Sequence, residues 1–271
     1  MNINYIVPFE MRGKNMQFRP CIDIHNGKVK QIIGSSLKDE GNQAAENFVS
    51  ERDAAFYADL YKKNHLKNGH IILLNSVDSE YYEATKKQAM LALKTYPGGM
   101  QVGGGITADN AAEFIKAGAS HVIVTSYVFR QGQILWENLE KLIKAVGKEH
   151  IVLDVSCRKK GQKYYVATDR WQTLTDIEVS AELITKLSAF CDEFLVHAVD
   201  VEGKNNGIET DLVKLLAQTE ADITYAGGVH DYDDLKLLKE MGNDKIHATI
   251  GSALDLFGGH MSFDEVCSFC K

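Results

Sequence analysis

The chain has 271 residues, of which 45% are hydrophobic and 25% are charged, and its formal net charge is −7 at pH 7. This length suits a single large domain, and α/β barrels typically have about 250 residues. The acidic balance argues against a nucleic-acid binder, because such proteins present a basic face. No apolar run approaches the ~20 residues of a membrane span, so we expect no membrane partner.

The five cysteines are odd in number and scattered along the chain. This distribution is typical of a reducing compartment, and we expect a cytoplasmic protein. The first 16 residues show no periodic pattern. We interpret residues 1–16 as an N-terminal extension and predict one domain over residues 17–271.

Short apolar runs alternate with amphipathic segments along the whole chain, which predicts βαβ units and a parallel sheet. The predicted strands are 18–24, 70–74, 99–102, 121–125, 151–155, 193–199, 223–226 and 245–250. The predicted helices are 54–64, 81–96, 110–117, 136–146, 180–189, 209–217, 231–241 and 262–269. Eight strand–helix units that close on themselves make a (β/α)8 TIM barrel, and this is the predicted fold.

Three connections are unusually long: 25–50, 156–176 and 200–209. The first contains three glycines, as a mobile lid over an active site would. Within the second, residues 158–167 have the pattern of a small hairpin. All three follow the carboxyl ends of strands, and barrel active sites lie on that side. We therefore expect the functional site there.

The two halves of the chain carry the same features in the same order. Asp23 ends the first strand and Asp154 ends the fifth. In each half a glycine cluster then follows the third strand, and a serine follows the fourth. The matching order predicts an internal duplication of a half-barrel.

The glycine clusters are candidate phosphate sites. Glycine lets the backbone approach a ligand closely, and the N–H groups at a helix start bind anions. Two equivalent sets, half a barrel apart, predict a ligand with two phosphates. The predicted binding residues are Gly104, Gly105, Thr125 and Ser126 in the first half, and Gly227, Gly228, Gly251 and Ser252 in the second.

Asp23 and Asp154 are the candidate catalytic residues, because strands one and five lie on opposite sides of a barrel. Opposed carboxyl groups work as general base and general acid when their surroundings give them different pKa values. The alternative is that either aspartate only orients a loop. No spacing of His, Cys and Asp indicates a metal site.

Seven segments together resemble the phosphoribosylformimino-aminoimidazole carboxamide ribotide (ProFAR) isomerases of histidine biosynthesis, in the branch typical of eukaryotes. They are FRPCIDIHNGKVKQIIG, QVGGGIT, LDVSCRKK, VATDRWQTLTD, FLVHAVDVEG, YAGGVHDYDDL and TIGSAL. The resemblance extends from about Gln17 to the C-terminus. It implies a cofactor-free Amadori rearrangement, in which an aminoaldose becomes an aminoketose, on a small ribotide substrate with a phosphate at each end.

The same resemblance implies roles for individual residues. Asp23 is the expected base that removes the C2′ proton, and Asp154 is the expected acid that protonates the ring oxygen. In the loop after the fifth strand, Trp171 is placed to stack on the aminoimidazole, with Arg170 as a polar clamp.

The sixth strand departs from the bacterial pattern of this family. His197 stands where a threonine is expected, and Glu202 stands where an aspartate is expected. His197 can either shuttle a proton or be a satisfied core histidine. Glu202, or Asp200 beside it, can share or replace the role of Asp154 as the acid.

Three alternatives remain. The related cyclase subunit of imidazole glycerol phosphate synthase has a lysine eight residues after its first aspartate. Here that position is Gln31, and Lys30 falls on the opposite face if the strand continues. Phosphoribosyl-anthranilate isomerase uses a cysteine base, and Cys21 lies two residues before Asp23, on the same face but deeper. A non-catalytic phosphosugar-binding barrel would keep the glycines without needing both aspartates. Half-barrel duplication makes a monomer sufficient, and we expect a monomer.

Overall fold

The computed structural model describes residues 15–32, 45–169, 171–202 and 207–270. Its main element is a sheet with eight parallel strands, in the order β15-β14-β13-β9-β6-β5-β4-β1. These are β1 (Cys21–His25), β4 (Gly69–Leu73), β5 (Met100–Gly103), β6 (Val122–Val124), β9 (Ile151–Asp154), β13 (Glu193–His197), β14 (Asp222–Ala226) and β15 (Ile246–Ala248). Each coincides with a predicted strand.

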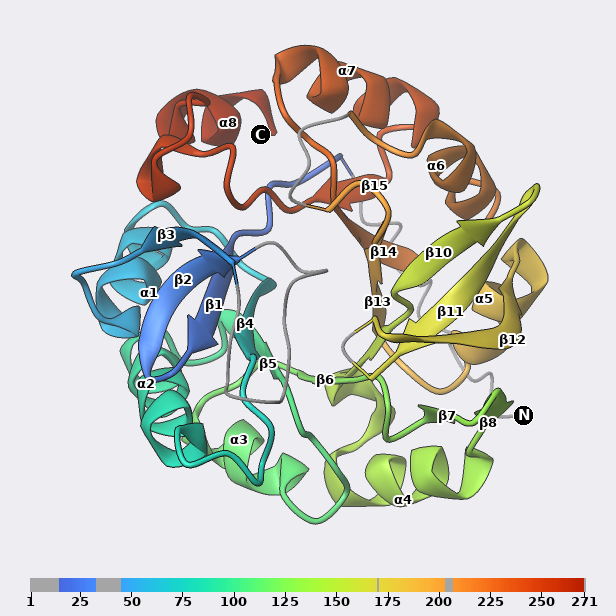
Figure 1. Cartoon of the computed structure of the whole chain (residues 1–271), viewed down its shortest axis with the longest axis horizontal. Coiled ribbons are helices and arrows are strands. Elements are labelled where there is room, and N and C mark those ends of the chain that lie inside the picture. The colour runs from blue at the N-terminus through green and yellow to red at the C-terminus, as the bar shows by residue number, and fades with distance from the viewer. Residues whose placement is uncertain (1–14, 33–44, 170, 203–206, 271) are drawn as a thin grey trace, which may run out of the picture.

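Eight α-helices lie on the outside of the ring that these strands form in Figure 1. They are α1 (Ala54–Lys63), α2 (Tyr82–Thr95), α3 (Ala111–Ala117), α4 (Trp136–Val146), α5 (Ala181–Leu187), α6 (Thr210–Leu216), α7 (Tyr232–Met241) and α8 (Phe263–Phe269). Short 3-10 turns cover Lys148–His150 and Asp255–Phe257. Several helices begin where the side chain of an Asp or Ser accepts a hydrogen bond from the first turn, as at Asp53, Ser180, Asp231 and Ser262. The α/β prediction is confirmed.

The two ends of the eight-stranded series meet. Phe18, just before β1, forms a parallel bridge with Ala248 in β15. The Arg19 amide donates to the Ala248 carbonyl at 2.8 Å, and the Ala248 amide donates to the Gln17 carbonyl at 2.9 Å. The segment before β1 therefore pairs with the last strand.

Additional strands extend from the ring after β1 and after β9, on opposite sides in Figure 1. After β1 come β2 (Lys28–Ile32) and β3 (Glu46–Val49), and after β9 come β10 (Cys157–Lys160), β11 (Lys163–Thr168) and β12 (Thr173–Val179). A small pair, β7 (Phe129–Arg130) and β8 (Gln133–Ile134), precedes α4. The predicted hairpin at 158–167 is confirmed, and β12 adds a third strand to it. Parts of the two other long connections, 33–44 and 203–206, lie outside the described residues, as do residues 1–14 of the predicted extension.

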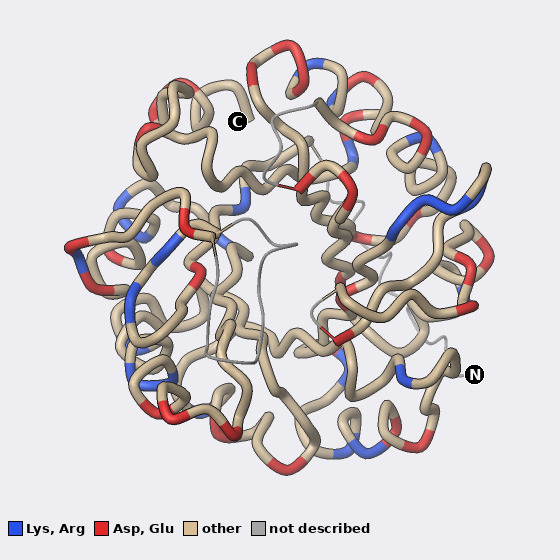
Figure 2. Tube along the Cα trace, viewed as in Figure 1, with Lys and Arg blue, Asp and Glu red and all other residues tan. Residues whose placement is uncertain are grey.

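Charges of both signs are distributed around the outer elements in Figure 2, and the most continuous basic stretch is Arg158–Lys160 in β10. No helix within the described ranges is long and apolar enough to cross a membrane. All five cysteines are buried.

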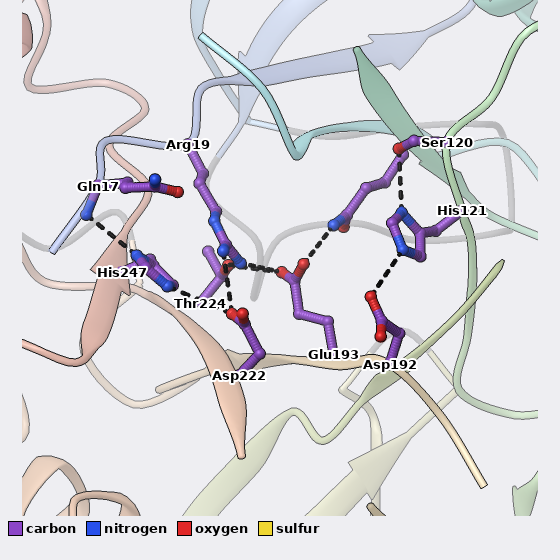
Figure 3. Close-up of polar contacts among 10 residues, drawn as sticks. Gln17, Arg19, Ser120, His121, Asp192, Glu193, Asp222, Thr224 and His247 are labelled. Atoms are coloured by element: carbon purple, nitrogen blue, oxygen red, sulfur yellow. Dashed lines mark hydrogen bonds and ion pairs between the residues drawn. The ribbon is translucent and has the colours of Figure 1, made fainter. Parts of the chain in front are cut away.

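Arg19 is the centre of a buried polar network at the amino-terminal ends of the strands (Figure 3). Its side chain is only 2% exposed, and its guanidinium lies 2.7 Å from Glu193 Oε1 and 2.9 Å from Asp222 Oδ1. Thr224 also donates to Glu193 Oε1 at 2.7 Å, and Gln101 donates to Glu193 Oε2 at 2.7 Å. One cation thus compensates two carboxylates and links the start of β1 to β13 and β14.

We predict that Arg19→Met lowers the free energy of unfolding by about 3–5 kcal/mol, because it leaves the buried carboxylate of Glu193, and the partly exposed carboxylate of Asp222, without the guanidinium. Urea denaturation measures this change. The control is Lys236→Met, which breaks an ion pair whose side chains are 58% and 87% exposed, and should cost less than about 0.5 kcal/mol. Equal losses in the two variants would show that the network does not hold the sheet ends together.

Candidate active site

The candidate site lies directly above a small apolar layer inside the ring of strands. Ile123, Val152, Leu195 and Ala226 form this buried layer, with Ile72 packed against it. Side chains two residues apart in a strand point to the same face of the sheet. Thr125, Asp154 and His197 each lie two residues after a member of this layer. The strand pattern therefore directs them inward, toward the carboxyl-terminal end of the ring.

A cavity opens at this end of the strands. It brings Asp23 from β1 together with His197 from β13 and with Glu202 from the connection after β13. All four predicted phosphate-binding residues of the second half also line it, namely Gly227, Gly228, Gly251 and Ser252. A carboxylate, an imidazole and an anion cradle thus share one cavity.

The glycine positions in the two halves have matching backbone geometry. Gly104 has φ +103° and Gly227 has φ +109°, values that L side chains rarely adopt. A Cβ at Gly104 would lie 2.1 Å from the Leu73 carbonyl oxygen, and a Cβ at Gly227 would lie 2.9 Å from that of Ala198. In both cases the glycine passes close to the end of the neighbouring strand, where a larger residue would collide with backbone.

Asp23 is a carboxyl group whose surroundings favour the protonated form. Burial and the nearby charge of Glu202 raise the pKa of Asp23 to about 7. His197 and a hydrogen bond from Gln31 Nε2 to Asp23 Oδ2, at 3.4 Å, act in the opposite direction. A base that exchanges its proton near neutral pH suits removal of a carbon-bound proton.

Asp154 is held as an anion by its neighbours. Ser156 Oγ donates to Asp154 Oδ1 at 2.7 Å, and Thr125 Oγ1 donates to Asp154 Oδ2 at 3.0 Å. Burial works against the charge, but His197, Ser156 and Thr125 outweigh it and lower the pKa of Asp154. The side chain of Asp154 is 13% exposed, and that of His197 is 12% exposed.

His197 lies next to Asp154. Its Nδ1 is 3.6 Å from Asp154 Oδ1 and 3.4 Å from Ser156 Oγ. Burial lowers the pKa of an imidazole, but here the adjacent Asp154 outweighs burial, with help from the charges of Glu202 and Asp23. The pKa of His197 is therefore raised. His197 lines the cavity together with Asp23 and Glu202.

Glu202 adds a second acidic group to the cavity wall. Its Oε2 is buried and has no hydrogen-bond partner among the residues that the structure describes. Burial raises the pKa of Glu202, and the charge of His197 partly offsets this. Asp200, the other alternative, is engaged elsewhere, since its Oδ2 accepts a hydrogen bond from the Lys159 amide at 2.8 Å.

The remaining predicted site residues lie apart from this cavity's lining. Thr125 hydrogen-bonds to Asp154, and Ser126 Oγ accepts a hydrogen bond from the Asp169 amide at 3.3 Å. The ring of Trp171 packs against the ring of His197, with centroids 5.3 Å apart. Arg170 lies outside the described residues.

Three residues at this site have no catalytic or binding role predicted from the sequence. Gln31 and His70 line the cavity, and Ser156 binds Asp154. For Gln31 the signal was present: Asn26-Gly27 is a typical two-residue hairpin turn, and both residues have positive φ. The turn pairs Ile24 with Val29 and so folds β2 back beside β1, which returns Gln31 to Asp23.

One group of potential metal ligands occurs among the described residues: His230, Asp231 and Asp234. The carboxylates of this group accept hydrogen bonds from backbone amides. Asp231 Oδ1 accepts hydrogen bonds from the Asp233 and Asp234 amides, and Asp234 Oδ2 accepts one from the His230 amide. These contacts cap the start of α7, and none of the three side chains lines the cavity around Asp23.

The chain is similar to isomerases from plants and fungi over most of its length. The chloroplastic 1-(5-phosphoribosyl)-5-((5-phosphoribosylamino)methylideneamino) imidazole-4-carboxamide isomerase of Medicago truncatula is 51% identical over 260 residues, which cover 94% of this chain and 82% of the relative. The isomerase of the same name from Neurospora crassa is 44% identical over 247 residues, 90% of this chain and 93% of the relative. The isomerase of Saccharomyces cerevisiae is 41% identical over 260 residues, which cover 93% of this chain and 97% of the relative.

A family model described as histidine biosynthesis protein matches residues 17–261. This range covers every described side chain of the candidate site. The resemblance inferred from the seven sequence segments is confirmed. By this match and by its relatives, the chain belongs to the histidine biosynthesis protein family.

Proposed function

We propose that this chain is the isomerase that converts ProFAR to its aminoketose by a cofactor-free Amadori rearrangement. The observation that carries the proposal is the shared cavity, in which Asp23 faces His197 beside the glycine cradle of the second half. The relatives named above carry the same activity in their names. The substrate is a small ribotide with two phosphates.

Asp23 acts as the base. An acid first protonates the ribose ring oxygen, and the ring opens to a Schiff base. Asp23 then removes the C2′ proton, and the resulting enolamine collapses to the ketose. The pKa of Asp23, raised by burial and by Glu202 to about 7, keeps much of the carboxyl ionised at neutral pH and yet basic enough for this step. The acid belongs to the cluster of His197, Asp154 and Glu202.

The two glycine cradles hold the two phosphates. Gly227, Gly228, Gly251 and Ser252 bind one phosphate at the cavity wall, and Gly104, Gly105 and Ser126 bind the other across the ring. Thr125, which donates to Asp154, is assigned to that carboxylate instead. Trp171 and Arg170 remain the predicted contacts to the aminoimidazole.

The fold, oligomeric state and location that we propose are those predicted from the sequence. The bridge between Phe18 and Ala248 supports a closed (β/α)8 barrel. The matching geometry of Gly104 and Gly227 supports duplicated halves. A monomer and a cytoplasmic location stay predictions, and the Medicago truncatula relative is named as chloroplastic.

Two observations favour this isomerase over the cyclase subunit and over phosphoribosyl-anthranilate isomerase. The cyclase subunit needs a lysine at position 31, but the neutral Gln31 contacts Asp23, while the ammonium of Lys30 pairs with Glu46. A cysteine base needs an accessible thiolate, but burial and the charge of Asp23 raise the pKa of Cys21 well above its usual value. A phosphosugar-binding barrel without catalysis would not require a carboxyl group with a raised pKa at the position of Asp23.

Turnover of the aminoaldose by the purified full chain tests the function. The ketose is followed by the absorbance change with a downstream cyclase present. Ketose formation without added metal or cofactor is expected. Ligand binding without turnover would favour the binding barrel, and ammonia-dependent cyclisation of the ketose by this chain alone would favour the cyclase.

We predict that Asp23→Asn abolishes turnover while substrate affinity stays within about tenfold, or ~1.4 kcal/mol, because the change removes a proton acceptor and leaves the phosphate contacts in place. Steady-state kinetics and equilibrium binding of the aminoaldose measure the two effects. Turnover close to that of the wild type would refute Asp23 as the base.

The same variant should be more stable than the wild type at high pH. The pKa of Asp23 is about 7 in the folded chain and about 4 in the unfolded chain. The contribution of Asp23 to the stability of the folded chain is therefore most favourable below pH 4, and it is lost as the pH rises from about 4 through 7. Because Asp23 is partly accessible, we expect Asp23→Asn to gain about 1–3 kcal/mol at pH 8 and little near pH 4. Thermal unfolding at both pH values checks this, and a gain that does not depend on pH would contradict it.

A further inference from the structure

We propose that His197, as an imidazolium, delivers the proton that opens the ribose ring, and that Asp154 is the buried anion that positions it. This inference rests on the proposed isomerase function and names the acid of that reaction. It reverses the expected roles, in which Asp154 is the acid and His197 stands in for a threonine.

His197 and Asp154 are exposed to a similar extent, with 12% and 13% of their side chains accessible. His197 lines the cavity that Asp23 and Glu202 also line. His197 Nδ1 is the ring nitrogen directed at Asp154, at 3.6 Å from Oδ1. The other ring nitrogen, Nε2, is therefore the one available to a substrate.

Both oxygens of Asp154 already accept hydrogen bonds. Ser156 donates to Oδ1 at 2.7 Å, and Thr125 donates to Oδ2 at 3.0 Å. A carboxyl group that accepts from two hydroxyls and faces an imidazole is stabilised as the anion. Such a group has no proton to give at neutral pH, and it suits the role of counter-ion to an imidazolium.

The groups around His197 favour its charged form. Asp154 contacts it from the end of β9, and Asp23 on β1 and Glu202 on the connection after β13 share its cavity. His70 on β4 has its ring centroid 6.2 Å away, but burial lowers the pKa of His70 to about 3, so it is neutral and adds no competing cation. Trp171 covers the imidazole with its ring and also supplies no charge.

His197 and Asp23 together account for every proton that the reaction moves. The imidazolium gives its Nε2 proton to the ring oxygen, the bond from C1′ to that oxygen breaks, and the amine lone pair forms the C1′=N bond. Asp23 takes the C2′ proton, which gives the enolamine. In the last step the enol hydroxyl returns a proton to His197, and Asp23 gives its proton to C1′. Both residues end as they began.

The test compares His197→Asn, Asp154→Asn and a control, His65→Asn, in the full chain. Asn keeps a polar amide at position 197 but cannot carry an ionisable proton. His65 is exposed and has φ +57°, a conformation that Asn tolerates well. The measurements are kcat, KM and the pH dependence of kcat/KM for the aminoaldose.

We expect His197→Asn to lower kcat at least 100-fold with KM changed less than about threefold, and to remove the basic limb of the profile. Asp154→Asn should keep a basic limb but move it to lower pH, because the imidazolium loses its counter-ion. His65→Asn should match the wild type. A His197→Asn enzyme that keeps kcat within threefold, or a basic limb that survives in it and vanishes in Asp154→Asn, would overturn the assignment.

A second measurement needs neither turnover nor a folded His197 variant. In the chain labelled with 15N-histidine, one imidazole should titrate above pH 6.5, and that value should fall in Asp154→Asn. If every histidine titrates as in the unfolded chain, or if none responds to Asp154→Asn, the pairing is wrong. If the pairing is found but the wild type makes no ketose, the fault lies with the proposed function and not with the pairing.

Discussion

The close contact between His197 and Asp154 sets the electrostatics of the whole cavity. Burial disfavours every charge there, so the protons must be shared among Asp23, Asp154, Glu202 and His197. Asp154 has the hydroxyls of Ser156 and Thr125 and the nearest imidazole, and it remains charged. Asp23 has one long hydrogen bond from Gln31 and the repulsion of Glu202. The same residue type is thereby given two different pKa values within one site.

This asymmetry arises between two similar parts of the chain. Asp23 lies in the middle of β1 and Asp154 is the last residue of β9, and Gly104 and Gly227 each pass close to the end of a neighbouring strand. The additional strands after β1 and after β9 also lie on opposite sides of the ring (Figure 1). What differs is the neighbour that each aspartate receives: β2 brings the neutral Gln31 to Asp23, whereas β13 brings the ionisable His197 to Asp154. We propose that these different neighbours, Gln31 and His197, make one aspartate the base and the other the partner of the acid.

Much of this could be predicted from the sequence, because the signals are local. Eight apolar runs and eight amphipathic segments marked the strands and helices, and glycine pairs marked the backbone that must approach another strand. The contact of His197 with Asp154 could not be predicted. It depends on the register that pairs Leu195 with Asp154, which decides how far His197 projects beyond that carboxylate. The role of Gln31 similarly depends on the turn at Asn26-Gly27, a signal that was visible but was not combined with the position of Asp23.

The most direct measurement of the central claim, that Asp23 and the His197–Asp154 pair exchange protons with one substrate, is the pH dependence of kcat/KM for the wild-type chain. We expect a bell-shaped profile. Its acid limb should lie near pH 7, where Asp23 loses its proton, and its basic limb should lie above the ordinary histidine value of about 6.5. A rate that rises to a plateau and stays level to pH 10, or one with an acid limb near pH 4, would contradict it.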